Sequence, residues 1–151
     1  MSDMFHEYDL TEEEALELLE EESIGIFATV NEDGTPHAVP MHYLIIDGNV
    51  YMQSRPCGRK ISNVQRNPTC SLAVIDMHFH IDGARHRTGF QSAVFKGRGR
   101  MIEEESEKME ALGKIYRKQR KDRKVTPELV SKLGLIEIVP EAVTGKHRDS
   151  V

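Results

Sequence analysis

The chain has 151 residues, of which 38% are hydrophobic and 30% charged, as in one soluble globular domain and unlike a disordered protein. Its net charge of −5 disfavours nucleic acid as the main partner. Because no apolar run is long enough to cross a bilayer and no basic-then-apolar leader is present, we expect a cytoplasmic protein with no membrane partner. Its two cysteines, Cys57 and Cys70, lack the spacing of a zinc site, and we expect no metal.

Cap and turn residues divide the N-terminal half into a helix and several strand-like runs. Thr11 with Glu14 three residues later is a capping-box pattern, and it predicts a helix of about three turns. The strand-like runs that follow are rich in β-branched and apolar residues and cover 23–30, 35–46 and 49–54. An Asp-Gly pair separates each run from the next, which predicts consecutive hairpins and hence an antiparallel meander. A short helix over 58–66 comes next.

The C-terminal half begins with a fourth strand at 69–76. Residues 77–90 show no clear period and contain two glycines, so we expect a loop there. A fifth strand covers 91–102, where Gly97 and Gly99 indicate a bulge or a close approach of two backbones.

Two helices and a last strand complete the chain. A charged helix is predicted from 103 to about 124, and Thr126-Pro127-Glu128 has the residues that favour the start of another short helix. The last strand follows Gly134. The pattern as a whole predicts one domain over 1–151 that is mainly β with helices: a six-stranded antiparallel split β-barrel flanked by helices.

The stretch "YMQSRPCGRKISN" at 51–63 places two adjacent cations where a strand and a loop lead into a helix. A helix N-terminus attracts anions through its unpaired N–H groups, and Arg59 and Lys60 would add charge-assisted hydrogen bonds. Gln53 and Ser54, at the end of the strand, would supply two more donors. The stretch therefore predicts a phosphate site, and a pair of solvated surface cations is the alternative.

Pro40 interrupts the otherwise strand-like "HAVPMHYLI". Proline has no N–H for a ladder, so Pro40 indicates an edge strand or a bulge with backbone groups free for another partner. Protection of a sheet edge against unwanted pairing is the alternative role.

The order of these motifs is similar to that in the flavin-binding split-barrel proteins related to pyridoxamine 5'-phosphate oxidase, and most similar to the nitroimidazole-resistance (Nim)-like branch. The resemblance covers roughly residues 9 to 148. It rests on a strand ending in Ala-Thr-Val, a Val-Pro-Met segment, an Asp-Gly turn, Gly-Arg-Lys and Asn-Pro, followed by "SAVFKGRGRMIEEE" and "VTGKHR".

The resemblance implies a homodimer with FMN bound in grooves between the subunits. It implies that Arg59 and Lys60 hold the FMN phosphate, helped by Gln53 and Ser54. The edge of the isoalloxazine ring would lie along Val39, Pro40, Met41 and His42. Residues of the fifth strand would approach the cofactor from one or the other subunit, namely Gln91, Ser92 and Val94.

The activity that this resemblance implies is an oxidoreductase that passes electrons from a reduced nicotinamide to a small organic, nitroaromatic-like acceptor or to oxygen. Many Nim-like members have His-Gly where this chain has Gln53-Ser54, and "GKHRDSV" does not match the substrate-binding end of pyridoxamine phosphate oxidases. Haem, a deazaflavin and FAD are alternative cofactors. A flavin or haem carrier, or a redox sensor without turnover, is the alternative function, and a structural or nucleic-acid-binding dimer is a third.

Two other segments contain clustered polar or charged residues of the kinds that bind ligands. "DMHFHID" places Asp76, His78, His80 and Asp82 at alternate positions near His86, as a metal site or the wall of a flavin pocket would, although solvated loop residues are the alternative. The basic run at 114–124 follows acidic residues in the same predicted helix. This arrangement complements the helix dipole and is typical of a solvated helical face.

Overall fold

The computed structural model describes residues 5–82 and 85–150, with side chains described for 7–77 and 89–148. The strands are β1 (Phe5–Leu10), β2 (Ile24–Val30), β3 (Pro36–His42), β4 (Leu44–Ile46), β5 (Asn49–Ser54), β6 (Thr69–Asp82), β7 (Arg85–Met101) and β8 (Gly134–Ser150). The helices are α1 (Glu12–Glu21), α2 (Arg59–Arg66), α3 (Glu105–Lys118) and α4 (Pro127–Ser131).

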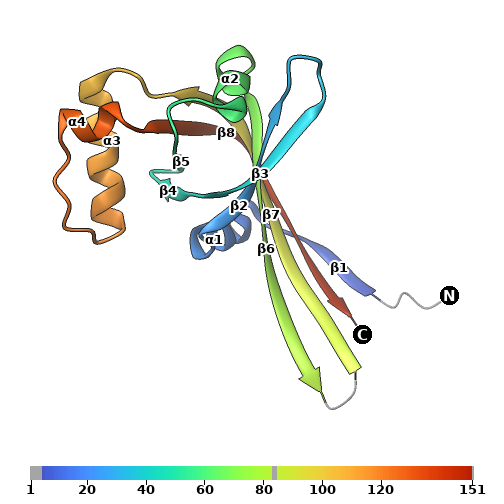
Figure 1. The fold of residues 1–151 in the computed structure, drawn as a ribbon. Helices are drawn as coiled ribbons and strands as arrows, with labels where there is room; N and C mark the ends of the chain where they lie inside the picture. Colours follow the sequence, from blue (N-terminus) through green and yellow to red (C-terminus); the bar gives the residue numbers. More distant parts are fainter. Residues whose placement is uncertain (1–4, 83–84, 151) are drawn as a thin grey trace.

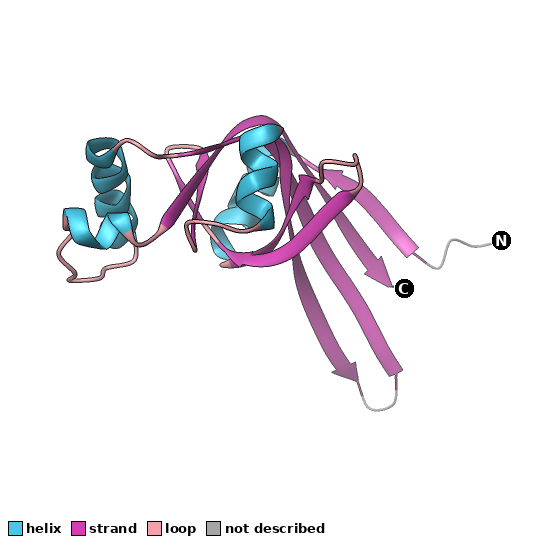
Figure 2. Cartoon of the chain, turned by 45° about the horizontal axis from the view of Figure 1, so that its top comes forward, coloured by secondary structure: helices cyan, strands magenta, loops and turns pink. Residues whose placement is uncertain are grey.

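All eight strands belong to one antiparallel sheet, in the order β3-β2-β6-β7-β8-β5-β4 with β1 added beside β8. The sheet curls into a half-open barrel, and β6, β7, β8 and β1 extend past it as a long arm (Figure 1). α1 lies against the barrel, while α3 and α4 form a lobe beside β4 and β5 (Figures 1 and 2). The expected antiparallel split barrel flanked by helices is therefore confirmed, with eight strands where six were predicted.

The predicted run 35–46 is divided at Tyr43 into β3 and β4, which lie at opposite ends of the strand order. β3 pairs with β2 and β4 pairs with β5, so both predicted Asp-Gly hairpins exist. They do not form a meander, because the chain crosses from one end of the sheet to the other at Tyr43. The phenol of this buried residue donates a hydrogen bond to the carbonyl of Leu19 in α1, which ties the crossing point to the helix.

The expectation of a loop at 77–90 is wrong. β6 continues to Asp82 and β7 begins at Arg85, and the two strands pair in register along this whole length. Met77, Phe79 and Ile81 alternate with polar residues, which is a strand pattern with period two. The extra strand β1 pairs with the end of β8 and was not predicted.

The predicted glycine signal in β7 is confirmed. The register between β7 and β8 shifts between Lys96 and Gly97, as in a β-bulge. A Cβ at Gly97 would overlap the carbonyl oxygen of Val139, so the close approach of the two backbones requires glycine. The capping box is also confirmed, because Thr11 and Glu14 bond reciprocally at the start of α1.

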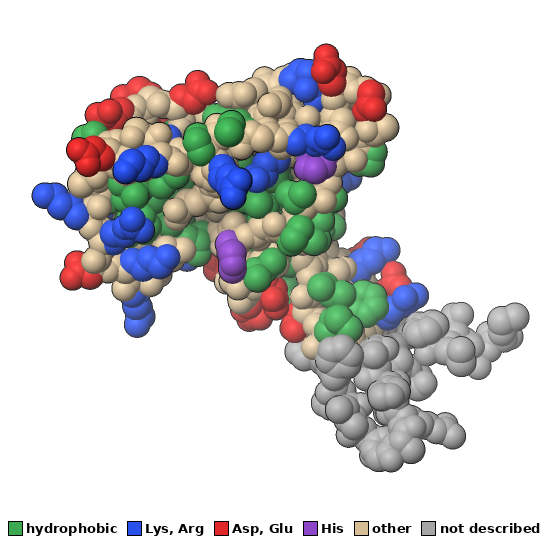
Figure 3. Space-filling model, viewed as in Figure 1, with side chains coloured by type: hydrophobic (Ala, Val, Ile, Leu, Met, Phe, Trp, Pro, Cys, Tyr) green, Lys and Arg blue, Asp and Glu red, His purple; other side chains and the backbone are tan. Residues whose placement is uncertain are grey.

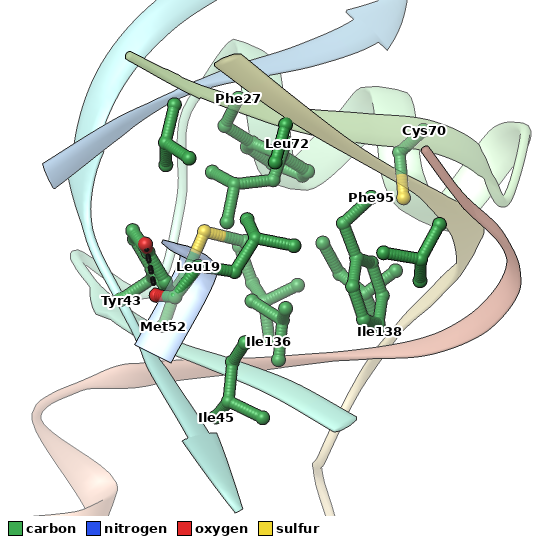
Figure 4. Packing of buried hydrophobic residues seen from close by; sticks show 14 of the residues in the cluster. Leu19, Phe27, Tyr43, Ile45, Met52, Cys70, Leu72, Phe95, Ile136 and Ile138 are labelled. Atoms are coloured by element: carbon green, nitrogen blue, oxygen red, sulfur yellow. Dashed lines mark hydrogen bonds between the residues drawn. The ribbon is translucent and has the colours of Figure 1, made fainter. Parts of the chain in front are cut away.

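Two clusters of buried side chains hold these elements together. The barrel cluster fills the space between the curled sheet and α1, where residues such as Leu19, Phe27, Met52 and Phe95 converge (Figure 4). A second cluster joins α3 and α4 to Leu135 at the start of β8. The α3–α4 lobe is thus fixed to the barrel by its own apolar contacts, and this fixed lobe forms one wall of the cavity described below.

Candidate functional site

The predicted ring-binding segment, Val39 to His42, lies on strand β3 at the end of the sheet order. β3 pairs with β2 alone among the described strands, as the proline predicted for an edge strand. Pro40 and His42 are exposed on the outer side of the strand, and Val39 and Met41 are half-buried on the inner side. The other edge of β3 therefore has backbone N–H and C=O groups that no described strand pairs with.

The predicted phosphate site lies at the start of α2, whose first residues are Arg59 and Lys60. Gly58 precedes the helix at a φ of 131° and provides no side-chain cap, and the first turn contains no acidic residue. The N–H groups of this turn and the two cations are thus available to an anion. Arg59 is exposed, and no described residue forms a hydrogen bond or ion pair with it. Ser54 is half-buried at the end of β5, and its hydroxyl donates to the carbonyl of Arg55.

A cavity of about 550 Å³ opens between the β3–β4 junction, β5 and the C-terminal end of α3. We call it the α3 cavity, and it is lined by Ser23, His42, Tyr43, Leu44, Tyr51, Gln53, Ile115, Gln119 and Lys121. Its volume is within the usual range for small-molecule sites. Because His42 and Gln53 both line it, the structure brings part of the predicted ring-binding segment and part of the predicted phosphate site to one cavity.

A network of polar side chains supports the wall of the α3 cavity. The phenol of Tyr51 donates to Glu137 at 2.6 Å, and Nε of Arg100 donates to the same carboxylate at 2.9 Å. The Arg100 guanidinium also bonds Glu107 of α3. Burial, reinforced by the carboxylate, raises the pKa of Tyr51 to about 12, so this phenol stays protonated at physiological pH.

Glu137 is 8% exposed. Burial by itself raises the pKa of this carboxyl group, but hydrogen bonds from Tyr51 and Arg100 outweigh burial and hold the pKa below its ordinary value. Glu137 is therefore a buried carboxylate whose ionised form is stabilised by the hydrogen bonds that Tyr51 and Arg100 donate to it. Neither Tyr51 nor Glu137 was predicted as a site residue, although a lone acid inside the apolar stretch "LIEIV" is the signal of a buried, paired charge.

The three residues predicted on β7 do not line the α3 cavity. Val94 belongs to a cross-strand row on the outer face of the sheet, which continues through Ala73 and Ile26 to Pro40. Three strand spacings separate Val94 from Pro40, a distance of about 14 Å. Ser92 shares the outer face with Val94.

Gln91 lies on the inner face, where its side-chain nitrogen is 2.7 Å from Nδ1 of His147. Because an amide nitrogen only donates, Nδ1 is the acceptor of this hydrogen bond. The imidazole of His147 also stacks on Tyr8, with ring centroids 4.7 Å apart. The two neighbouring residues Gln91 and Ser92 thus face opposite sides of the sheet.

The outer face of the sheet exposes an unusual amount of apolar surface. Four large hydrophobic side chains on β2 and β6 are each about half exposed: Ile24 at 52%, Ile26 at 45%, Ile75 at 51% and Met77 at 45%. We refer to these four as the outer apolar face. Figure 3 shows hydrophobic side chains exposed between Lys and Arg side chains on the face that it presents. Exposed apolar surface on one face of a sheet is typical of interaction sites in soluble proteins.

The metal cluster considered at Asp76 to His86 falls mostly outside the described side chains. Those of His78, His80, Asp82 and His86 are not described, and only Asp76 is. Within 7–77 and 89–148, no three His, Cys, Asp or Glu side chains gather as metal ligands would. In the part of the chain that the structure describes, no helix is both long enough and apolar enough to cross a membrane.

The sequence was compared with family models, with curated proteins and with solved structures. The model of the pyridoxamine 5'-phosphate oxidase family matches residues 11–147. The chain belongs to this family. No curated protein matches the chain.

Several solved structures share the fold. A candidate 5-nitroimidazole antibiotic resistance protein from Bacteroides thetaiotaomicron is 21% identical with a TM-score of 0.83, over 96% of this chain and 89% of that one. A FAD-binding protein from Mesorhizobium loti is 24% identical with a TM-score of 0.70, over 95% and 98%. An FAD and heme binding protein from Mycobacterium smegmatis is 15% identical with a TM-score of 0.75, over 91% and 72%. Identities this low show that the chain shares the fold of these proteins.

Proposed function

We propose that the protein is an FMN-dependent oxidoreductase that takes electrons from a reduced nicotinamide and delivers them to a small electron-poor organic acceptor or to oxygen. The observation that carries the proposal is the start of α2, where Arg59 and Lys60 flank N–H groups without a side-chain cap. These groups fit the phosphate of FMN, because a dianion needs several charge-assisted donors at one point.

The neighbouring residues fit the rest of the cofactor. Gln53 and Ser54 end β5 one short loop before α2, where they would meet the sugar-alcohol chain and phosphate. The unpaired edge of β3 offers backbone donors and acceptors for the polar edge of the ring, from Val39 to His42. Bound FMN supplies the electron-transfer chemistry, and the chain supplies binding, orientation and electrostatics.

The α3 cavity is the proposed acceptor site. It combines the apolar surfaces of Leu44 and Ile115 with the amide of Gln119 and the cation of Lys121. A small aromatic molecule with electron-withdrawing polar substituents matches this mixture of apolar and donor groups. The phenol of Tyr51 keeps its proton and is directed toward Glu137, so we propose no acid, base or nucleophile among the side chains.

We further propose that the active form is a homodimer built on the outer apolar face, with a cofactor groove at each side of the interface. One observation supports this: the four large hydrophobic side chains of the outer apolar face are each about half exposed, and exposed apolar surface marks interaction sites in soluble proteins.

The dimer is tested by Ile75→Lys, which places a charge on the outer apolar face. We expect light scattering to give a dimeric mass for the unchanged protein and a monomeric mass for the variant, with weaker FMN binding in parallel. A matched control, Val139→Lys, changes another side chain that is 45% exposed. A monomeric unchanged protein that binds FMN tightly would refute the interface.

The cofactor site is tested by titrating the protein with FMN while recording absorbance and flavin fluorescence. The double variant Arg59→Ala/Lys60→Ala should bind FMN at least tenfold to a hundredfold more weakly, because each lost charge-assisted bond is worth about 1.5 to 3 kcal/mol. Arg123→Ala/Lys124→Ala removes the same charge from an exposed segment outside α2 and should leave FMN affinity unchanged. Unchanged affinity in a folded Arg59/Lys60 variant would overturn the phosphate placement.

Turnover distinguishes an enzyme from a carrier. Rapid bleaching of the bound flavin by a reduced nicotinamide, with recovery on adding a nitroaromatic compound or oxygen, is the result expected for the enzyme. Slow bleaching that does not saturate with donor concentration would favour a flavin carrier or sensor. A Soret band in the purified protein would favour haem, with His42 as one ligand to test.

A further inference from the structure

A second pocket, of about 530 Å³, lies between the β2–β3 turn and α2. We call it the turn–α2 pocket, and it is lined by Asn31, Glu32, Asp33, Arg59, Asn63 and Arg66. Every lining side chain is polar or charged, which differs from the mixed lining of the α3 cavity. Each pocket is lined by a residue proposed to bind the cofactor, Gln53 in the α3 cavity and Arg59 in the turn–α2 pocket.

Hydrogen bonds fix the two walls of the turn–α2 pocket against each other. Asn63 of α2 is 3% exposed, and its amide nitrogen donates to the hydroxyl of Thr29 and to the side-chain oxygen of Asn31, both at 3.0 Å. Arg66 donates to the carbonyl of Val30 at 2.8 Å and to Asn63 at 3.0 Å. A pocket held by a buried polar network is pre-organised for a polar ligand.

The pocket presents cations and carboxylates side by side. Arg66 makes both of its hydrogen bonds through Nη2, so Nη1 and Nε remain for a ligand beside the exposed Arg59. Oδ1 of Asp33 accepts the backbone N–H of Thr35 at 3.0 Å and is also 2.5 Å from its hydroxyl, which leaves Oδ2 for a ligand. These hydrogen bonds from Thr35, with a smaller contribution from Arg59, lower the pKa of Asp33 and keep it ionised.

This combination selects the ligand chemistry. A simple anion such as phosphate would be attracted by the two arginines and repelled by Glu32 and Asp33. A ligand that carries hydroxyl donors next to a phosphate satisfies both kinds of group. Carboxylates accept hydrogen bonds from ribose hydroxyls in dinucleotide sites, and arginines bind phosphates through bidentate hydrogen bonds.

We propose that the turn–α2 pocket binds the adenosine 5'-phosphate part of a dinucleotide, with the phosphate on Arg59 and Arg66 and the ribose hydroxyls on Asp33. The inference builds on the proposed function, because Arg59 is shared with the proposed FMN phosphate site. FAD and a reduced nicotinamide adenine dinucleotide both contain this group. The first would extend the flavin from the start of α2 into the pocket, and the second would bring the electron donor beside the flavin.

The first experiment measures binding of 5'-AMP to the full chain by calorimetry. We expect saturable binding in the unchanged protein and at least fivefold weaker binding in Glu32→Gln/Asp33→Asn, which keeps the size and removes the charge of both carboxylates. Glu12→Gln/Glu13→Gln makes the same change in charge on exposed residues of α1 and should not alter AMP affinity. Absence of AMP binding at millimolar concentration, or tighter binding after removal of the carboxylates, would overturn the inference.

Competition then identifies the source of the group. If AMP displaces FAD, and the unchanged protein prefers FAD to FMN at least tenfold, the group belongs to the flavin. If FMN and FAD bind equally and AMP competes with the reduced nicotinamide, the group belongs to the donor. AMP that binds without competing with either would refute the dinucleotide assignment.

Failure of this inference is distinguishable from failure of the proposed function. FMN affinity measured on the Glu32→Gln/Asp33→Asn variant should not fall below that of the unchanged protein, since neither carboxylate contacts FMN in the proposed site and both repel its phosphate. Intact FMN binding together with no AMP binding would refute the ligand proposed for the turn–α2 pocket and leave the proposed FMN site supported. Absence of FMN binding by the unchanged protein would refute the proposed function itself.

Discussion

The substitution Arg100→Met removes the guanidinium that lies 2.9 Å from the Glu137 carboxylate. Glu137, 8% exposed, would keep its hydrogen bond from Tyr51 and lose its counter-charge. Removing one partner of a fully buried ion pair costs about 3–5 kcal/mol. The Arg100 side chain is 49% exposed, so solvent already screens part of the interaction, and we expect a loss of about 2–3 kcal/mol in the free energy of unfolding.

Urea unfolding followed by circular dichroism measures this loss at neutral pH in Arg100→Met, Glu137→Leu and the double variant. The double variant has no buried charge, so it should be more stable than Arg100→Met alone. The interaction energy from this cycle should exceed about 1 kcal/mol. A loss below about 0.5 kcal/mol for Arg100→Met, or a double variant no more stable than that single variant, would refute the buried-carboxylate reasoning.

The pH dependence of the same measurement has a definite sign. The pKa of Glu137 is lower in the folded protein than in the unfolded chain, so its stabilisation is present above the unfolded pKa of about 4.3. This stabilisation is lost as the pH falls through the folded value. In Arg100→Met, burial should instead raise the folded pKa, so the stability deficit of the variant should be largest at neutral pH. It should shrink as the pH falls from the raised folded pKa of the variant to the lowered folded pKa of the unchanged protein.

Three further predictions follow from buried contacts. Tyr43→Phe removes the phenol that bonds the carbonyl in α1 and should lower the free energy of urea unfolding by about 1–3 kcal/mol; an unchanged midpoint would contradict this. Gly97→Ala places a Cβ against a backbone carbonyl and should cost about 3 kcal/mol or more, whereas Gly34→Ala at the open turn, where only the backbone strain of a φ of 85° opposes it, should cost less. Iodoacetamide at mild alkaline pH should label the exposed Cys57 and spare Cys70, whose pKa burial raises to about 11, as mass spectrometry of the folded protein would show.

The parts of the fold that the sequence predicted are those decided by local chemistry. The capping box at Thr11 and the two Asp-Gly hairpins each depend on residues within a few positions of one another. The bulge at Gly97 was marked by its residue type alone, although the strand that it approaches, β8, comes much later in the chain. Pro40 predicted an edge strand or a bulge for the same reason, since its missing N–H disfavours a central ladder, and the structure has the edge strand.

The parts of the fold that the sequence did not predict are those that depend on contacts between residues far apart in the chain. The division of 35–46 at Tyr43 has no break in hydrophobicity to mark it, because the residues on both sides are strand-like and only the closure of the barrel separates them. β1 is a single short strand that depends on the far end of β8 for its ladder. The stretch expected to be a loop at 77–90 forms strand because the residues from Met77 to Asp82 alternate with period two, and Gly89 pairs with His78 within the ladder.

Of the candidate site, the sequence predicted His42 on β3 and Gln53 on β5, which the structure brings to one cavity. It did not find the network of Tyr51, Arg100 and Glu137, because these come from three strands far apart in the sequence. It also grouped Gln91 with Ser92, although alternation along a strand sends neighbouring side chains to opposite faces. Their roles toward a cofactor stay predictions.

Strand β8 pairs with β1, β5 and β7, so it connects the first strand of the chain to elements from the middle. The ribosome releases β8 after all three of these strands, and until then β1 has no ladder partner and β5 pairs with β4 alone among the described strands. The nascent chain therefore keeps part of its apolar sheet uncovered until β8 emerges, with high contact order and slow closure as consequences. Cells that produce this protein should accordingly need holdase chaperones more than its modest length would suggest, and truncation before Gly134 should yield insoluble protein rather than a smaller barrel.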